Sequence, residues 1–389
     1  MPGPERTPLH RLAEELDRMS RPPLFPEIGP ATAAALFQGV PGAPAVPTDP
    51  QVWEEELPAI VFDRLAGLAL TAASNGNVSL PAASFDRLRQ ESAHRSASVL
   101  MVEERAIAVT DALRTNGIPL VITKGPGIAR AYPDRSLRPF SDIDILVPQP
   151  RFNEAAAIML SLGFHEAGPQ PRPYFNHSCR EAVNLKREDG ASIDLHHHIP
   201  PWVWGGRIDF ANIVEASESH QVVGGELPVA STEHNLLIAA LHVISDKGRP
   251  GRTLMVWRDL IALSAACDVE VAVREARRSR LDWLVSYVLQ ELPDFAAPRE
   301  LIDGLGQIAP SRRDARRMQL LLPPGIGSRH QISQAFRLPL PQALAFLAGY
   351  VFPSRTFLRS RFGRDWSYVS WWDEAFIRFR NARSVSVGP

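Results

Sequence analysis

The chain has 389 residues, which at about 150 residues per domain predicts two to three structural units. Apolar residues make up 45% and charged residues 22%, so the chain has enough apolar material for a sizeable core and is not mainly disordered. The 42 Lys and Arg residues balance 43 Asp and Glu residues, which gives a formal net charge of −1. This near-neutral charge excludes the class of strongly basic proteins that coat nucleic acid.

The cysteine count and the hydropathy pattern bear on the compartment. Two cysteines, Cys179 and Cys267, are too few for a disulfide framework. No apolar stretch approaches the ~20 residues of a membrane-spanning helix. The charged N-terminus lacks the apolar region of a secretory signal. We therefore expect a cytoplasmic protein.

The first 116 residues contain no strand pattern. Residues 1–50 hold a short amphipathic stretch, 9–19, and then a dense run of prolines, which predicts an extended, loosely packed arm. Residues 51–116 favour helices. The clearest one runs from Ser84 to Asn116, where apolar residues recur at helical spacing and Asn116-Gly117 is typical of a helix end.

The hydrophobic period changes at residue 117, and residues 117–230 are predicted to form a small unit with a mixed sheet. The order is strand, helix, strand, helix, strand, strand. The predicted strands cover 118–123, 142–147, 181–187 and 192–199, and the predicted helices cover 128–132 and 152–162.

Residues 231–389 are predicted to be almost wholly helical. The stretch from Ser354 to Arg380 mixes arginines with aromatic residues, and it is expected either to pack on the body as a helix or to bind a partner protein. The predicted helices cover 232–244, 253–266, 269–278, 281–289, 311–321 and 340–348. The fold class is therefore α+β, with a small mixed-sheet core between an N-terminal helical segment and an all-helical C-terminal region.

Asp142 and Asp144 are the most informative residues. Residues i and i+2 of a strand point to the same face, so the two carboxylates repel each other unless a cation lies between them. Mg²⁺ in proteins is typically held by one or two carboxylates together with substrate phosphates. The pair alone is equally compatible with two solvated acids at a sheet edge.

Three neighbouring features favour a phosphate and metal site. The turn Lys124-Gly125-Pro126-Gly127 follows a buried strand, and its glycines allow backbone N–H groups to approach a phosphate, although a plain turn has the same pattern. Arg135 and Arg138 precede the acidic pair. Asp194 and His196 share one face of a later strand, where Asp194 would be a third carboxylate for a two-metal site or a proton acceptor.

Three sequence blocks resemble the uncharacterised nucleotidyltransferases of bacteria, within the DNA polymerase beta-like superfamily. The blocks are Val121–Gly125, Arg138–Val147 and Ile193–His196. The helical stretch Glu233–Leu263, with His242, Trp257 and Asp259, is similar to the family's following helices, and 352–363 is weakly similar to its tail. The resemblance covers residues 110–365. The chain departs from the superfamily at Gly125-Pro126, where Gly-Ser is usual, so one N–H donor and one hydroxyl are missing.

The resemblance implies a Mg²⁺- or Mn²⁺-dependent enzyme that transfers a nucleoside monophosphate from a nucleoside triphosphate to an acceptor and releases pyrophosphate. It implies that Asp142, Asp144 and Asp194 hold the metal ions and that Asp194 assists the attacking group. It further implies a set of nucleotide-binding residues, namely Lys124, Gly125, Gly127, Arg138, Ser141 and His196.

The acceptor stays open among a small molecule, a peptide, a protein side chain and a tRNA end. The neutral net charge favours an acceptor other than nucleic acid, with a toxin-type tRNA nucleotidyltransferase as the runner-up. A catalytically idle nucleotide-binding adaptor is the alternative from another class, and Pro126 is the residue that favours it.

Other clusters have plainer interpretations. The run His196-His197-His198 could hold zinc, but consecutive strand residues point alternately, so His197 is expected behind the sheet. His242 is expected to be a core histidine. The arginines of 274–280 and 312–317 are expected to be solvated helix faces, with a surface for an anionic acceptor as the alternative.

Overall fold

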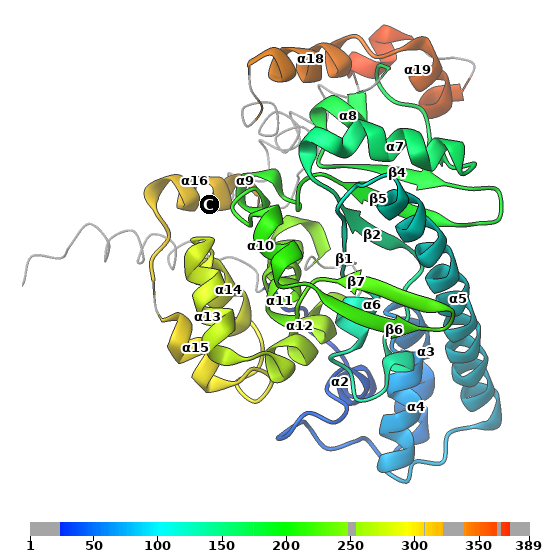
Figure 1. The fold of residues 1–389 in the computed structure, drawn as a ribbon. Helices are drawn as coiled ribbons and strands as arrows, with labels where there is room; N and C mark the ends of the chain where they lie inside the picture. Colours follow the sequence, from blue (N-terminus) through cyan, green and yellow to red (C-terminus); the bar gives the residue numbers. More distant parts are fainter. Residues whose placement is uncertain are drawn as a thin grey trace, which may run out of the picture.

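A computed structural model describes residues 24–173, 175–247, 254–306, 308–321, 338, 340–363 and 367–373. Its centre is a seven-stranded mixed sheet with helices on both faces (Figure 1). The strands are β1 Val121–Thr123, β2 Ile143–Leu146, β3 His165–Glu166, β4 Ala182–Lys186, β5 Ser192–His196, β6 Glu218–Val222 and β7 Gly225–Val229.

The strand order in the sheet is β3-β4-β5-β2-β1-β7-β6. β2 pairs parallel with β5 and antiparallel with β1, and β1 pairs parallel with β7. The four predicted strands are present, and the α+β class is confirmed. The β6–β7 hairpin and the short β3 were not predicted. β6 is polar and lies at the sheet edge, and β7 contains Pro228, so neither has the apolar pattern of a buried strand.

Helices account for most of the rest of the described chain. Their bounds are α2 Pro30–Leu36, α3 Pro50–Phe62, α4 Ala66–Asn75, α5 Ala82–Thr115, α6 Gly125–Ala129, α7 Phe152–Ser161, α8 Phe175–Cys179, α9 Trp202–Gly205, α10 Phe210–Glu215, α11 Thr232–His242, α12 Met255–Ala266, α13 Val269–Arg278, α14 Asp282–Gln290, α15 Arg299–Leu305, α16 Arg312–Leu321, α18 Leu340–Val351 and α19 Arg355–Phe362. Short 3₁₀ turns cover Arg135–Leu137 and Gln149–Arg151, and a π-helical turn, Val243–Lys247, continues α11. No helix of the described ranges is long and apolar enough to cross a bilayer.

The prediction of an extended arm over 1–50 is wrong for its second half. α2 is a helix whose residues Ala31, Ala35 and Leu36 are fully buried. Pro30 occupies the first helical position, where the missing N–H costs nothing, and the carboxylate of Glu56 accepts hydrogen bonds from the N–H groups of the next two residues. The amphipathic stretch 9–19 lies outside the described residues.

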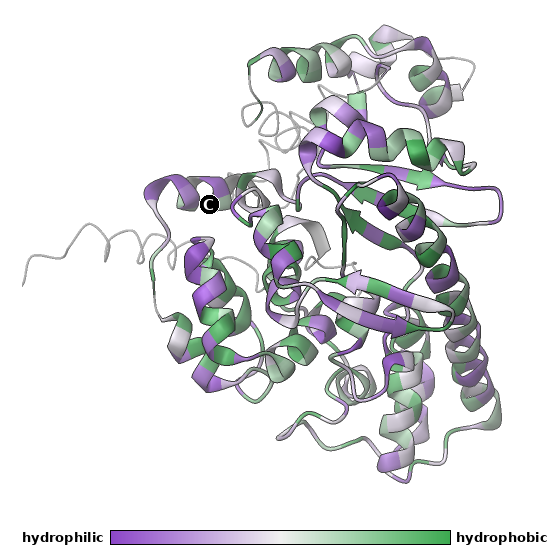
Figure 2. Cartoon of the chain, viewed as in Figure 1, coloured by the Kyte–Doolittle hydropathy of each residue, from purple (hydrophilic) through white to green (hydrophobic). Residues whose placement is uncertain are grey.

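Two apolar cores position the sheet. One packs the strands against α5 and α7, and the other packs α2–α4 against α11–α15. The long helix α5 was predicted almost to its ends, and Figure 2 shows that it alternates hydrophilic and hydrophobic residues along its whole length. Val121 of β1 and Leu146 of β2 belong to the core that α2–α4 form with α11–α15, so the sheet packs against both cores.

The described part of the C-terminal tail packs on the body. The rings of Phe175 in α8 and Phe346 in α18 stack with centroids 5.4 Å apart. Arg180 donates a hydrogen bond to the Tyr350 hydroxyl at 2.9 Å, and the Ser354 N–H donates to the carbonyl of Pro171 at 2.6 Å. The helix predicted over 340–348 is therefore present as α18. Of the stretch 354–380, α19 is helical and Ser354 binds the body, while 364–366 and 374–389 lie outside the described residues.

Candidate functional site

A cavity of about 470 Å³ lies where the ends of β1, β2 and β5 meet α11, α12 and the end of α3. Its lining is rich in charged groups, and the acids and bases come from both the sheet and the helices. The lining residues are Arg64, Lys124, Gly125, Ile128, Arg138, Pro139, Phe140, Asp142, Asp144, Glu181, Asp194, His196, Pro200, Pro201, Ala239, His242, Ser245, Met255, Val256 and Asp259.

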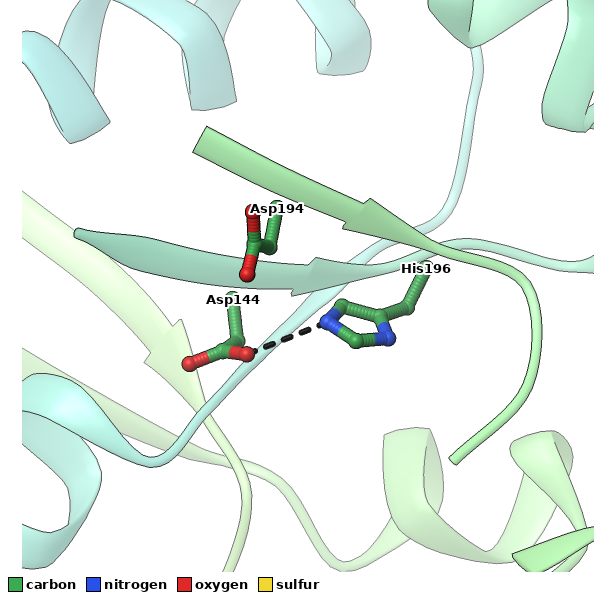
Figure 3. Close-up of side chains that lie close together, drawn as sticks. All are labelled: Asp144, Asp194 and His196. Carbon is green, nitrogen blue, oxygen red and sulfur yellow. Dashed lines mark hydrogen bonds and ion pairs between the residues drawn. The ribbon is translucent and has the colours of Figure 1, made fainter. Parts of the chain in front are cut away.

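The parallel pairing of β2 and β5 brings two acids together. Asp144 lies directly opposite Asp194 in the register, and His196 follows two residues later on the same face of β5. One ligand atom each from Asp144, Asp194 and His196 all lie within 4.8 Å of one another. Figure 3 shows the Asp144 carboxylate and the His196 ring directed toward each other, with Asp194 beside them. We call these three residues the carboxylate cluster.

Asp144 is buried, and two bases compensate its charge. Its Oδ1 accepts hydrogen bonds from Lys124 Nζ at 2.5 Å and lies 3.0 Å from His196 Nε2. Burial alone would raise the pKa of this carboxyl, but Lys124 and His196 hold the pKa well below its usual value. Asp144 is therefore an anion in a buried position, which is the state that a metal ligand requires.

Asp142 differs from Asp144 although both line the cavity. It precedes β2, is half-buried and is not part of the carboxylate cluster. Burial raises its pKa, and the nearby charges of Asp144 and Asp194 raise it further. Three carboxylates thus gather at one strand end, and among the described residues only Asp144 is contacted directly by bases, Lys124 and His196. A site with this excess of negative charge favours a bound cation.

Asp194 has one side-chain partner in the described structure. Asn184, its neighbour across the β4–β5 pairing, donates a hydrogen bond from Nδ2 to Asp194 Oδ1. A neutral donor orients the carboxylate without neutralising it. Asp194 also lines the cavity, and no base among the described residues forms an ion pair with it.

The turn after β1 is held by a residue that the sequence did not single out. The Lys124 N–H donates to Asn235 Oδ1 at 2.8 Å, and Asn235 Nδ2 donates to the Ala230 carbonyl at 2.9 Å. A Cβ at Gly127 would lie 2.8 Å from Asn235 Nδ2, so glycine is needed there for packing. Gly127 does not line the cavity, and its predicted contact with nucleotide has no support from this position.

Arg138 lines the cavity but is committed to a carboxylate. Its Nε and Nη2 donate to the two oxygens of Asp259 in α12 at 3.0 and 2.7 Å, and the Tyr132 hydroxyl donates to the same carboxylate at 2.7 Å. Burial would lower the pKa of Arg138, but Asp259 holds it above its usual value. Arg135 instead pairs with Glu103 of α5 at 2.6 Å. Ser141 is exposed and lies outside the lining.

The three consecutive histidines do not converge. His196 faces the cavity, whereas the His197 ring packs on Phe152 and its Nε2 hydrogen-bonds the Arg180 carbonyl at 2.8 Å. His198 packs against Trp202. Only His196 of the three joins a metal-ligating group within the described residues, which counts against a three-histidine zinc site.

The remaining predictions divide. His242 is buried, as expected of a core histidine, and it also lines the cavity. In α13, Arg274 and Arg278 are exposed and lie near Glu275, while in α16 the buried Asp314 binds Arg207 and Arg317. Sequence reasoning missed Arg64, Asn235 and the role of Asp259, because only the tertiary fold brings each of them to the cavity or to the turn after β1.

Comparisons with known proteins place the chain. No curated protein sequence matches it. The antibiotic-resistance factor ANT(2'')-Ia has a solved structure with 15% sequence identity and a TM-score of 0.32, over 49% of this chain and 96% of that one. An antigenic nucleotidyltransferase-like protein from Paracoccidioides brasiliensis has 16% identity and a TM-score of 0.29, over 50% of this chain and 92% of that one.

The family comparison is decisive and covers most of the chain. The model of the uncharacterised nucleotidyltransferases matches residues 49–295, which include α3, the carboxylate cluster and Asp259. The match begins earlier than the resemblance drawn from the sequence blocks, and it does not include the tail at 352–363. The chain belongs to the family of uncharacterised nucleotidyltransferases.

Proposed function

We propose that the protein transfers a nucleoside monophosphate from a nucleoside triphosphate to an acceptor, with a divalent cation held at the strand end. The observation that carries the proposal is the carboxylate cluster, in which Asp144 and Asp194 lie opposite each other beside His196 in a cavity that also holds Lys124. Membership of the nucleotidyltransferase family supports the same class of reaction.

The donor set fits a hard cation. The carboxylates of Asp144 and Asp194, with that of Asp142 nearby, offer mostly oxygen ligands, which Mg²⁺ and Mn²⁺ prefer. A single histidine is a weak basis for a zinc site. Asp142, Asp144 and Asp194 would hold the ion, with His196 beside them. A bound divalent cation would neutralise phosphate oxygens and favour attack at the α-phosphorus.

The chain's own groups have separate tasks in this proposal. Lys124, which forms an ion pair with Asp144, would bind a phosphate oxygen once a cation neutralises that carboxylate. Asp194, oriented by Asn184, would accept the proton of the attacking hydroxyl. The acceptor oxygen forms a bond to the α-phosphorus, the bond to the bridging oxygen breaks, and pyrophosphate leaves. The Arg138–Asp259 pair would hold the cavity wall in place.

A labelling experiment tests the proposal. Purified protein is incubated with each nucleoside triphosphate labelled at the α-phosphate, with Mg²⁺ or Mn²⁺ and a cell extract. We expect a labelled acceptor that forms only with the added cation and survives a zinc-selective chelator. Asp142→Asn/Asp144→Asn serves as the inactive control. Equal labelling by this double variant, or stoichiometric zinc that is lost together with activity, would contradict the proposal.

The same experiment separates the alternatives. Pro126 is buried in the turn and has no N–H, and this favours a nucleotide-binding adaptor without turnover. Such a protein would bind the triphosphate with the cation but label nothing. A label that ribonuclease removes would identify a tRNA-type acceptor, and a label that protease removes would identify a peptide or protein.

A further inference from the structure

Arg64 reaches the cavity from an unusual backbone position. It follows the end of α3 and has φ 63°, in the left-handed region where glycine is favoured. The Leu65 N–H donates to the Ile60 carbonyl at 3.0 Å and the Arg64 N–H donates to the Val61 carbonyl at 3.2 Å. These two bonds form the Schellman end of a helix, in which the left-handed residue is usually glycine. An arginine is a costly choice for this position on conformational grounds.

The position of Arg64 is also anchored to the helical side of the cavity. The neighbouring Asp63 accepts a hydrogen bond at 2.9 Å from the N–H of Leu254, the residue before α12. The end of α3 is thereby joined to the helix that carries Asp259. Arg64 itself is half-buried and lines the cavity together with Lys124 and Asp142.

The charge of Arg64 has no direct partner among the described residues, in contrast to the other two cations of the lining. Arg138 binds Asp259 with two nitrogens, and Lys124 binds Asp144. Burial lowers the pKa of Arg64, the nearby cation Arg95 lowers it further, and the charge of Asp142 offsets this only in part. A half-buried guanidinium without a carboxylate partner is a ready site for an anion.

The turn after β1 is short of N–H donors for a polyphosphate, because, of its glycines, only Gly125 lines the cavity. Pro126 has no N–H, and the Lys124 N–H is taken by Asn235 at 2.8 Å. Other donors in the cavity must supply what this turn does not. Guanidinium groups bind phosphate oxygens through two parallel hydrogen bonds, which a lysine cannot do.

We propose that Arg64 binds the β- and γ-phosphates of the donor nucleoside triphosphate, the part that leaves as pyrophosphate. This inference rests on the proposed function and deepens it. The carboxylate cluster would bind near the α-phosphate and the acceptor. Arg64 lies on the helical side, and the acid that raises its pKa most is Asp142, which is outside the cluster. The N-terminal helical segment is then part of the nucleotide site.

Calorimetry with the full-length protein and Mg²⁺ tests the proposal. The variants are Arg64→Ala, Arg64→Lys and Arg64→Gly, and the matched control is Arg89→Ala, an arginine exposed on α5. The probes are an α,β-methylene nucleoside triphosphate, pyrophosphate and the corresponding nucleoside monophosphate. We expect Arg64→Ala to weaken triphosphate and pyrophosphate binding by about 10-fold or more, the effect of losing a charge-assisted hydrogen bond. Monophosphate binding should change less than about two-fold, and Arg64→Lys should be intermediate.

Arg64→Gly distinguishes binding from a structural role. Glycine suits the left-handed position, so the thermal midpoint should stay the same or rise by about 2 °C while triphosphate affinity falls as in Arg64→Ala. A midpoint that drops by several degrees together with the affinity would assign Arg64 to the fold instead and overturn the inference.

The outcomes also separate this inference from the function on which it rests. If wild type binds the triphosphate and Arg64→Ala binds it equally well, the inference is wrong and the proposed function stands. If Arg64→Ala weakens the monophosphate as much as the triphosphate, the contact is with another part of the nucleotide and the inference is again wrong. If wild type binds neither triphosphate nor pyrophosphate, both the function and the inference are wrong.

Discussion

On the strand side of the cavity, one lysine and one histidine contact Asp144 but neither Asp142 nor Asp194, whereas on the helical side Arg138 and Asp259 satisfy each other. The register of β2 and β5 forces the acids together despite their repulsion, because the backbone pairing fixes where their side chains begin. The helical pair is a closed bidentate contact with Tyr132 as a third member. Uncompensated charge therefore marks the part of the cavity that is open to ligands, and compensated charge marks the part that supports it.

The largest effect should come from breaking the strand side at Asp144. Asp144→Asn removes a ligand of the proposed cation and also the anion that Lys124 and His196 contact. We expect the transfer rate to fall by about 10³-fold or more, the equivalent of several kcal/mol of charge stabilisation. Rates of labelled transfer measure this, and an unchanged thermal midpoint is the control for folding. A rate within ten-fold of wild type would remove Asp144 from the site.

Breaking the helical side should instead cost stability. Asp259→Asn leaves the Arg138 guanidinium buried without its anion, and such losses amount to about 3–5 kcal/mol. Urea denaturation gives the free energy of unfolding. The double variant Arg138→Met/Asp259→Leu should be less harmful than Asp259→Asn, because it removes both charges. If the single variant lost less than the double one, the pair would not have the supporting role described above.

The far face of the strand end provides a pH test. Burial, followed by the nearby His198, lowers the pKa of His197 to about 4 from an ordinary 6.5. A depressed pKa means that the neutral ring stabilises the fold above pH 6.5, and that this contribution is lost as the pH falls toward 4. At pH 4 the loss should reach about 3 kcal/mol. His197→Gln should be less sensitive to acid over this interval, as measured by unfolding at each pH, and identical slopes for the two proteins would refute the assignment.

The smallest of these effects concerns Asp194. Because its role is proposed to lie in accepting a proton, Asp194→Asn should lower kcat by about 10²-fold while triphosphate binding weakens only a few-fold. Asn184→Ala, which removes the orienting hydrogen bond, should give a smaller loss of kcat in the same direction. Single-turnover rates set beside calorimetric binding make the comparison. Near-normal single-turnover chemistry in Asp194→Asn would leave only Asp142 and Asp144 as candidates.

Local patterns predicted four of the seven strands, the longer helices and the acids at the strand end. Alternation along a strand was enough to place Asp194 and His196 on one face, and the short blocks were enough to identify the family. The roles of the individual site residues stay predictions. The arm over 1–50 was misjudged because prolines at first helical positions start helices as well as interrupt them.

Long-range partners set the boundary of what the sequence could predict. Arg138 was expected to face nucleotide, but its partner Asp259 lies 121 residues away, and nothing in either neighbourhood indicates the pairing. Asn235, which accepts a hydrogen bond from the Lys124 N–H, lies 111 residues from Lys124 in the sequence. To predict that Arg64 lines the cavity, the sequence would have had to show that α3 ends in a left-handed residue and that this end reaches the cavity.

The hydrogen bonds of Asn235 make the conformation of the turn after β1 depend on two regions of the chain. Asn235 lies in α11, outside the predicted 117–230 core, yet it holds the Lys124 N–H and the end of the β7 segment at once. A segment cut at residue 230 would contain the acids of the cavity but not Asn235, the residue that binds the Lys124 N–H. Transplanting this site onto another scaffold would therefore require the first two turns of α11 as well as the sheet.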